Sequence, residues 1–556
     1  MRSTLRFGLL CVLALLALPV PGQAQGLRTV PLDHWSYAVA DELLLRHPEW
    51  GQGLHLAARP WREADFTTLV ARGQEAGLDE DDPSSGFIEV LADAFRPDSG
   101  PTVERGVTMH NEVSLIYEGY LAKDDASFEP PFLPPRFGED DVDAGGRTGR
   151  PPHRGMARHD FAVQYLDHFA LGWRYALDSH VKSDPTRFRQ LEARKGEDFG
   201  FALLDAYGTA HYGPLYLTIG RNEQSYGLGR GSALLLSDSI PPLDHARIEL
   251  DTRGFHFTGM IARLSSDLQN RALDAEGNII PQTPPPDSGG REVDRMLYLH
   301  RADWQPNTMF QLAVTEAAVV TGIDRGIEVR YANLLVPFFV SQEDEDEREG
   351  RNVNIAVDLE GALTLPQGVR LYGMVMADEF FVDEKLREDI GNQLAWRVGG
   401  AWGGAVGPHR VTVGAEYTRA DVFMYLHRGL NTNWSTFGVP LGSSLGPDAD
   451  QGVAWLTWYP RPTARVTFEG LARRGGERSI ETLENVVQAG RPSFPSGIVQ
   501  RELRGGVEGW WLLPRWGVEA LVRANVRNVQ NLDNVDSGDE KFWNLSLGLR
   551  WGWQFR

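Results

Sequence analysis

The sequence predicts a mainly β protein: an antiparallel transmembrane β-barrel of 16–18 strands, with 18 the expected number, and a small N-terminal helical unit. Three observations predict this fold. They are an apolar leader, a period of two in the apolar residues over most of the chain, and connections that alternate between short and long. We therefore expect a signal peptide at residues 1–24, a periplasmic helical unit at 27–100 and an outer-membrane barrel at 105–556.

Residues 1–24 have the pattern of a secretory signal peptide. Arg2 and Arg6 precede an apolar core at residues 7–20, and a small-x-small cleavage site lies directly before Gln25. The core is too short for a membrane-spanning helix, and no run of 18 apolar residues occurs elsewhere in the chain. The leader therefore predicts export.

Charge and cysteine usage exclude several classes of protein. Cleavage removes Arg2 and Arg6 and no acid, so the formal net charge falls from −21 to −23, which argues against a nucleic-acid partner. The one cysteine, Cys11, lies in the leader, so the exported chain has no disulfide and no thiol nucleophile. The histidines are scattered and form no HExxH motif. The sequence predicts no enzyme, no cofactor and no metal site.

Helical patterns occupy the first segment after the leader. The stretch DHWSYAVADELLLRHP begins at Asp33, a good N-cap, and carries an apolar stripe. READFTTLVARGQEAG and SSGFIEVLADAFRPD each fit a helix of two to four turns. We predict a three-helix unit within residues 27–100.

After residue 104 the apolar period changes from helical to two. Clear examples are residues 169–178, 353–359 and 518–526, in which every second side chain is apolar. Such segments of about 9–13 residues have the length of tilted membrane strands. They predict the strands of a barrel.

The connections between these strands are of two kinds. Eight short turns lie near residues 167–168, 211–214, 251–254, 305–308, 365–368, 404–408, 460–462 and 514–516. Nine long polar loops lie near residues 122–156, 180–198, 222–245, 266–293, 318–350, 381–391, 421–451, 475–500 and 529–541. Strict alternation with both chain ends on the turn side is typical of bacterial outer-membrane barrels. The strand count takes 318–350 as one loop, although residues 327–340 could themselves form a strand.

The C-terminal stretch WNLSLGLRWGWQFR predicts the closing strand. Its odd positions from Trp543 to Phe555 are large and apolar, and its even positions include Arg550. We expect the apolar row to face lipid between two aromatic girdles, and the strand to pair with the first strand near residues 107–121. This pairing leaves no edge, and we expect a monomer in the outer membrane of a bacterial cell.

Inward positions of such a wide barrel are the first place to look for ligand binding. The alternation places inside Arg174, Arg370, Arg397, Arg465, Arg504, Arg523 and Arg550, together with Glu416, Glu469, Glu508 and Glu519. Guanidinium groups bind carboxylates, so the wall could bind acidic sugars; alternatively, these arginines pair with lumen acids and only organise the interior. The candidate ligand-binding residues are Arg370, Arg397, Arg465, Arg504 and Arg523 in the wall and Trp434 in an aromatic loop.

The segment GRNEQSYGLGRGSALLLSDSIPPLDHARIEL, residues 220–250, resembles the signature of the capsule assembly protein Wzi family. The resemblance rests on Gly220-Arg221, on Tyr226-Gly227 with Gly229, on the Leu-Leu-Leu-Ser run and on the Pro-Pro pair before the next strand. Tyr226-Gly227-Leu228 departs from the usual Trp-Gly-Pro. The resemblance implies an 18-stranded barrel with helices at its periplasmic end, which holds capsular polysaccharide at the cell surface in a lectin-like role. Arg221, Tyr226 and Arg230 of this segment join the candidate ligand-binding residues.

The N-terminal VPLDHWSY is similar to the opening of S-layer homology modules, although WREADF has Trp61 where those modules have threonine. The expected partners are therefore an acidic capsular or exopolysaccharide, lipopolysaccharide and other outer-membrane lipid, and peptidoglycan through the N-terminal helices. The expected function is binding or organisation of surface polysaccharide. The alternative is a porin or a substrate-specific channel.

Overall fold

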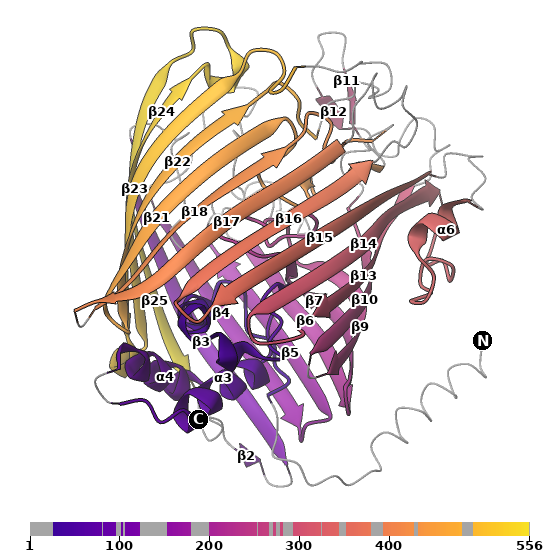
Figure 1. The fold of residues 1–556 in the computed structure, drawn as a ribbon. Helices are drawn as coiled ribbons and strands as arrows, with labels where there is room; N and C mark the ends of the chain where they lie inside the picture. Colours follow the sequence, from indigo (N-terminus) through magenta and orange to yellow (C-terminus); the bar gives the residue numbers. More distant parts are fainter. Residues whose placement is uncertain are drawn as a thin grey trace, which may run out of the picture.

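Eighteen long antiparallel strands close into one barrel, as the sequence predicts (Figure 1). The structure, a computed structural model, describes residues 26–79, 82–95, 102–103, 106–122, 153–179, 200–252, 254–265, 271–273, 279–281, 293–323, 325–343, 352–379, 393–407, 409–427, 432–480 and 493–554. The barrel strands are β3 (Val107–Ala122), β4 (His153–Tyr165), β5 (Phe169–Asp178), β6 (Gly200–Tyr212), β7 (Leu215–Asn222), β9 (Leu243–Thr252), β10 (Phe255–Arg263), β13 (Val293–Trp304), β14 (Phe310–Ile323), β15 (Asn352–Leu365), β16 (Val369–Glu379), β17 (Gln393–Val406), β18 (His409–Ala420), β21 (Ala449–Arg461), β22 (Ala464–Gly475), β23 (Gln500–Leu513), β24 (Val518–Gln530) and β25 (Glu540–Gln554).

Short pairings add to this sheet or lie outside it. The two-residue β2 (Thr102–Val103) pairs beside β3. Three small two-stranded sheets join β1 (Ala58–Arg59) to β8 (Ser225–Tyr226), β11 (Arg271–Leu273) to β12 (Ile279–Pro281), and β19 (Ser435–Thr436) to β20 (Val439–Pro440). The first of these sheets matters most, because it ties the N-terminal segment to a loop that follows β7.

The predicted order of short turns and long loops is confirmed by the strand bounds. The largest difference is at β14, which continues to Ile323, so the loop expected at 318–350 begins after that residue. Val319 and Val320 are apolar β-branched residues that favour a strand, and the pairing of β14 with β13 continues to Ile323.

Strand β25 closes the barrel against β3, with Asn544 opposite Ala122 at one end and Gln554 opposite Glu112 at the other. Its side chains alternate as predicted: Trp543 and the leucines are exposed on the outer face, while Asn544 and Arg550 are buried toward the lumen. Because β25 and β3 pair over most of their length, the sheet has no free edge. Phe555 and the leader lie outside the described residues.

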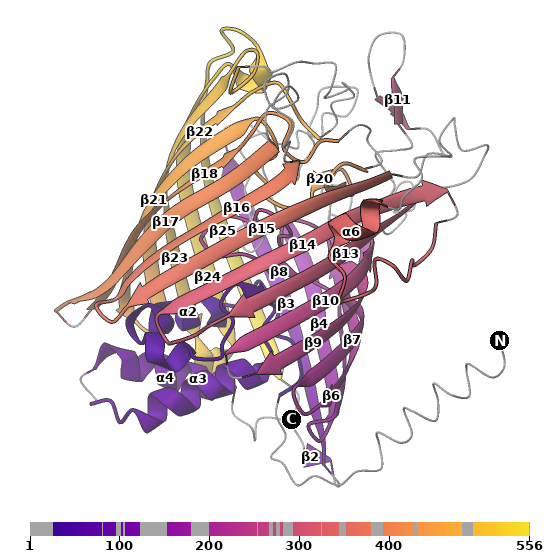
Figure 2. The ribbon, with the colours of Figure 1, turned by 45° about the vertical axis from the view of Figure 1, so that its right-hand side comes forward.

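The N-terminal segment contains α2 (Ser36–Arg46), the 3₁₀ turn η1 (Pro48–Gly51), α3 (Glu63–Glu75) and α4 (Pro83–Ala94). We expected Asp33 to cap α2, and this expectation was wrong. The helix begins at Ser36 without a side-chain cap. The helices gather at one end of the barrel (Figures 1 and 2), where Gly53 N–H donates to Gln305 Oε1 in the short turn after β13 at 2.7 Å. Among the described residues, no helix has the length and apolar character needed to cross a membrane.

Asp33 instead contacts the barrel wall. Its Oδ2 lies 2.9 Å from the guanidinium groups of both Arg158 and Arg550, and its Oδ1 lies 3.5 Å from that of Arg174. These arginines come from β4, β25 and β5, so one carboxylate joins the N-terminal segment to three strands. Asp33 serves tertiary docking rather than helix initiation.

Residues 327–340 are not a strand; they belong to a segment on the outside of the barrel, residues 325–343, that we call the outer strap. It ends in α6 (Phe338–Glu343), beside β14 and β15 (Figure 2). Tyr331 and Phe338 pack on Tyr298, and Phe338 N–H donates to Glu316 Oε1 at 2.7 Å. Leu335 is 91% exposed. The strap thus covers polar groups of the outer wall and presents apolar side chains in their place.

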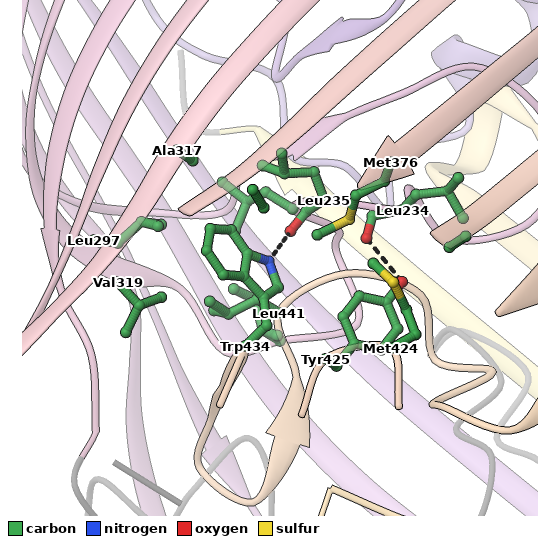
Figure 3. Close-up of a cluster of buried hydrophobic side chains, with 14 of the residues drawn as sticks. Leu234, Leu235, Leu297, Ala317, Val319, Met376, Met424, Tyr425, Trp434 and Leu441 are labelled. Atoms are coloured by element: carbon green, nitrogen blue, oxygen red, sulfur yellow. Dashed lines mark hydrogen bonds between the residues drawn. The ribbon is translucent and has the colours of Figure 1, made fainter. Parts of the chain in front are cut away.

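Two loops fill much of the lumen, residues 223–242 and the described parts of 421–448, and we call them the plug. Their apolar side chains pack against inward residues of β9 to β17 (Figure 3). Trp434 is fully buried and donates its indole N–H to the carbonyl of Leu235 at 2.8 Å. The Tyr425 hydroxyl donates to the carbonyl of Leu234, also at 2.8 Å. The two plug loops therefore occupy part of the barrel lumen.

Candidate functional site

An open cavity of about 420 Å³ lies inside the barrel between the plug and the strands on the other side of the lumen. Its volume is in the range of small-molecule sites. Strands β21 to β24 form one wall, and the plug loop after β7 forms the facing one. The polar residues that line it are Arg59, Ser225, Arg230, Ser232, Asp238, Ser239, Arg397, Glu416, Thr418, Ser443, Ser444, Gln451, Thr467, Glu469, Arg504, Glu508, Arg523 and Asn525.

The strand wall of the cavity carries a ladder of opposite charges. Arg504 lies 3.3 Å from Glu469 on the neighbouring strand. Arg523 lies 2.7 Å from Glu508, and Arg465 approaches the same carboxylate at 3.5 Å. Glu508 and Arg523 face each other across β23 and β24, whereas Arg504 with Glu469 and Arg465 with Glu508 are diagonal neighbours, two positions from facing. The arginines are thus inward, as predicted, and paired with lumen acids.

Arg230 enters the cavity from the plug. Its Nε lies 2.9 Å from Glu469 Oε2, and its guanidinium lies 5.3 Å from the centre of the Trp455 ring. With 38% of its side chain exposed, Arg230 is the most accessible of the candidate lumen arginines that form ion pairs. Sequence analysis did not select Trp455, although its odd position in β21 places it on the inward face.

Arg397 is buried and holds the plug in place. It pairs with Glu416 at 3.2 Å and donates to the backbone carbonyls of Gly231 at 3.0 Å and Ser232 at 2.6 Å. Gly229 has φ +109°, and a Cβ there would lie 2.3 Å from Glu416 Oε2. Only glycine allows the loop to approach the ion pair so closely. The glycines of the family-like segment therefore serve the docking of the plug.

The remaining candidates from the same segment lie away from the cavity. Tyr226 is buried in the apolar cluster, where its hydroxyl donates to Gln224 at 3.0 Å and its ring lies 5.3 Å from the Arg301 guanidinium. Arg221 follows the exposed Ile219 by two positions, so it faces outward, and it pairs with Asp244 at 2.6 Å. Neither side chain lies in the lumen cavity.

The other two candidates, Arg370 and Trp434, contact other parts of the protein and do not line the cavity. Arg370 faces the lumen near the N-terminal segment, and its Nε donates to Thr364 Oγ1 at 3.1 Å. Trp434 is completely buried in the apolar cluster of the plug. Hence Arg230, Arg397, Arg504 and Arg523 line the cavity, whereas Arg370, Trp434, Tyr226, Arg221 and Arg465 do not.

Hydroxyl and amide groups complete the cavity. Ser232 and Ser444 hydroxyls lie 3.0 Å apart across the two plug loops, and Thr467, Gln451 and Asn525 project from the strands. Such groups donate and accept hydrogen bonds in the pattern that sugar hydroxyls require. No single-sequence signal selects these common residues, since only the fold brings them to one surface.

A G-x-S-x-G pattern occurs at residues 442–446 and places Ser444 at the cavity. In hydrolases this pattern forms a sharp turn between a strand and a helix. Here the residues lie within a loop, and Ser444 N–H and hydroxyl both contact Ser232 Oγ. The local structure is that of a loop contact and not of a nucleophile elbow.

The chain is similar to a known protein family and to solved outer-membrane barrels. The model of the family Capsule assembly protein Wzi matches residues 141–539. Among solved structures, the Wzi outer-membrane protein of Escherichia coli, described as involved in group 1 capsule assembly and as a carbohydrate-binding β-barrel, matches with a TM-score of 0.60 and 10% identity, over 92% of this chain and 97% of its own. OccK8 (OprE) of Pseudomonas aeruginosa matches with a TM-score of 0.44 and 9% identity, over 81% and 98%.

No curated protein matches the chain. The family match covers well over half of the sequence, and the barrel has the 18 strands and the closed topology that the resemblance implied. The protein is a β-barrel of the bacterial outer membrane, and it belongs to the capsule assembly protein Wzi family.

Proposed function

We propose that this protein binds an acidic capsular or exopolysaccharide in the lumen cavity and holds it at the cell surface without catalysing a reaction. The observation that carries the proposal is the cavity of about 420 Å³ with Arg230 and Glu469 in its lining; the Arg230 guanidinium also lies 5.3 Å from the centre of the Trp455 ring. The carbohydrate binding named for the Escherichia coli relative agrees with this assignment.

The charge arrangement suggests how an acidic sugar would bind. Arg230 is the accessible partner of Glu469, so a ligand carboxylate can take the place of that glutamate on the guanidinium. Glu469 retains Arg504 at 3.3 Å when Arg230 turns to the ligand. The Trp455 ring, 5.3 Å from the Arg230 guanidinium, helps to hold that side chain at the cavity. The neighbouring hydroxyls and amides then orient the sugar ring.

The test is binding of polysaccharide purified from the producing strain to the detergent-solubilised protein, with neutral dextran as the reference polymer. Arg230→Ala should weaken binding of the acidic polymer about tenfold, which corresponds to about 1.4 kcal/mol. Arg221→Ala is the matched control, because Arg221 also pairs with an aspartate but faces outward. If both variants bind as wild type, the lumen cavity is not the site.

The channel alternative makes a different prediction. An open pathway along β21 to β24 would give stable conductance steps in planar bilayers, whereas a plug held by Arg397 and Trp434 should give none. In cells, loss of the gene should release capsule into the medium if the polysaccharide role is correct; unchanged surface staining would contradict it. Contacts with lipopolysaccharide, peptidoglycan binding by the N-terminal helices and a monomeric state stay predictions of the sequence.

A further inference from the structure

Three side chains that commonly bind transition metals meet where the N-terminal segment rests on the barrel. His55 follows η1, while Asp251 and His256 flank the short turn between β9 and β10. One ligand atom from each lies within 4.8 Å of the other two. The His55 and His256 side chains are only 8% and 6% exposed, respectively. The cluster is therefore an interior one, formed by two separate parts of the chain.

Each histidine directs into this cluster one nitrogen that lies 3.8 Å from the Asp251 carboxylate and makes no hydrogen bond within the described part of the chain. His55 Nε2 and His256 Nδ1 are buried and have no hydrogen-bond partner among the described residues. The other nitrogen of His256, Nε2, contacts Thr258 Oγ1 at 3.0 Å and Glu249 Oε1 at 3.5 Å. Metal-binding histidines are held in this way, with the second nitrogen bonded to a hydroxyl or carboxylate that orients the ring.

The surroundings leave space and balance of charge for a cation. A cavity of about 30 Å³ borders His55, Asp251 and His256, enough for one ion or water. Arg59, Arg62 and Arg247 border the same cavity; Arg59 pairs with Asp41 at 2.8 Å, and Glu249 pairs with Arg62 at 2.6 Å and with Arg247 at 3.1 Å. The carboxylate of Asp251 then remains 3.8 Å from both histidines.

We propose that His55, Asp251 and His256 bind one Zn²⁺ or a similar borderline transition-metal ion, and that this ion fastens the N-terminal segment to the barrel. Two imidazole nitrogens and one carboxylate oxygen form a ligand set that zinc accepts, with a fourth position left for water. Zinc–nitrogen bonds of about 2.0–2.1 Å require the ligand atoms to approach one another by about 1 Å, which side-chain rotation supplies. This inference is independent of carbohydrate binding.

The metal is tested on the full exported chain in detergent after removal of bound metal with a chelator. Titration with Co²⁺, followed by its visible absorption and then by competition with Zn²⁺, should give one equivalent bound. His55→Gln and Asp251→Asn change opposite sides of the site, and each should weaken Zn²⁺ binding at least tenfold. His47→Gln is the matched control, because His47 lies in the same segment but stacks on Trp50 and pairs with Glu49.

The fastening role has its own measurement. Zn²⁺, but not Mg²⁺, should slow proteolytic removal of the N-terminal segment from wild type and from His47→Gln, and should have no effect on His55→Gln. The site is refuted if the stripped protein binds neither Co²⁺ nor Zn²⁺, or if both site variants bind as wild type. Tight binding without protection from proteolysis would overturn the fastening role.

Discussion

The two sides of the lumen differ in what the strands direct inward. Strands β9 to β17 present Leu297, Val319, Met376 and similar apolar side chains, and the plug packs on them. Strands β22 to β24 present paired charges such as Arg523 and Glu508, and the cavity remains open beside them. Burial of apolar surface is favourable, whereas burial of a charged pair requires loss of its hydration. The plug therefore packs where inward apolar side chains gather, and the charged residues on the same strands, such as Arg301 and Glu360, are buried as ion pairs.

The largest expected effect breaks the apolar side. Trp434→Ala removes a fully buried indole and its hydrogen bond to Leu235. We expect a loss of about 4 kcal/mol in the free energy of unfolding. Denaturant titration of the detergent-solubilised protein measures it, with Trp516→Ala as the control in an exposed turn. Equal stability of the two variants would mean that the plug adds nothing to the fold.

Arg397→Ala tests the contact between the plug loop after β7 and the barrel wall. The substitution leaves Glu416 buried without its 3.2 Å partner and frees the loop carbonyls that Arg397 binds. The expected loss is about 3 kcal/mol, together with increased proteolysis of the plug loop after β7. Stability like that of wild type would show that the backbone amides of Arg230 and Gly231, which also bond Glu416, suffice to hold the loop.

Acid should weaken the docking of the N-terminal segment onto the barrel. Burial and the Arg550 guanidinium lower the pKa of His34, in the N-terminal segment, to about 3. Below its ordinary value near 6.5, the undocked state binds a proton that the docked state excludes, so docking weakens as pH falls from 6.5 toward 3. We expect a loss of about 1–2 kcal/mol by pH 5, measured by proteolysis of the N-terminal segment. His34→Gln should remove this pH dependence; the same slope in both proteins would assign it elsewhere.

The smallest expected effect on stability completes the comparison. Arg523→Ala removes a partly exposed member of the ladder, 2.7 Å from Glu508, which keeps Arg465 as a second partner. We expect a loss below about 1 kcal/mol in unfolding free energy. Arg523→Ala should nevertheless weaken binding of the acidic polysaccharide. Arg397→Ala, by comparison, is expected to act mainly on the free energy of unfolding. A large loss of stability would mean that the cavity wall is as structural as the plug side.

The wall of the barrel was predictable from the sequence, but the assignment of its arginines was not. A period of two identifies the inward face wherever one face of a strand meets lipid, so Arg397, Arg504 and Arg523 were correctly placed inside. Whether each one binds a ligand or another residue depends on loops that alternation does not describe. Arg397, which was selected for binding, lines the cavity and also donates to the carbonyls of Gly231 and Ser232, a contact that alternation does not predict.

Loops and long-range contacts account for the other differences. Asp33 fits the pattern of a helix cap, and only the docked helices reveal that it pairs with Arg158 and Arg550. Residues 327–340 have a strand-like composition, yet they form the outer strap because Tyr298 and Glu316 offer them contacts on the outer wall.

The barrel could be predicted from local patterns in the chain, including its strand number, its lipid-facing rows, its closing strand and the order of its turns and loops. These follow from local rules, because alternation of side chains is a property of every extended backbone and lipid enforces it at each strand. Tertiary structure alone decided the plug, the cavity and the meeting of His55 with Asp251 and His256. Those sites unite residues that are remote in the chain, and no local pattern encodes which of them become neighbours.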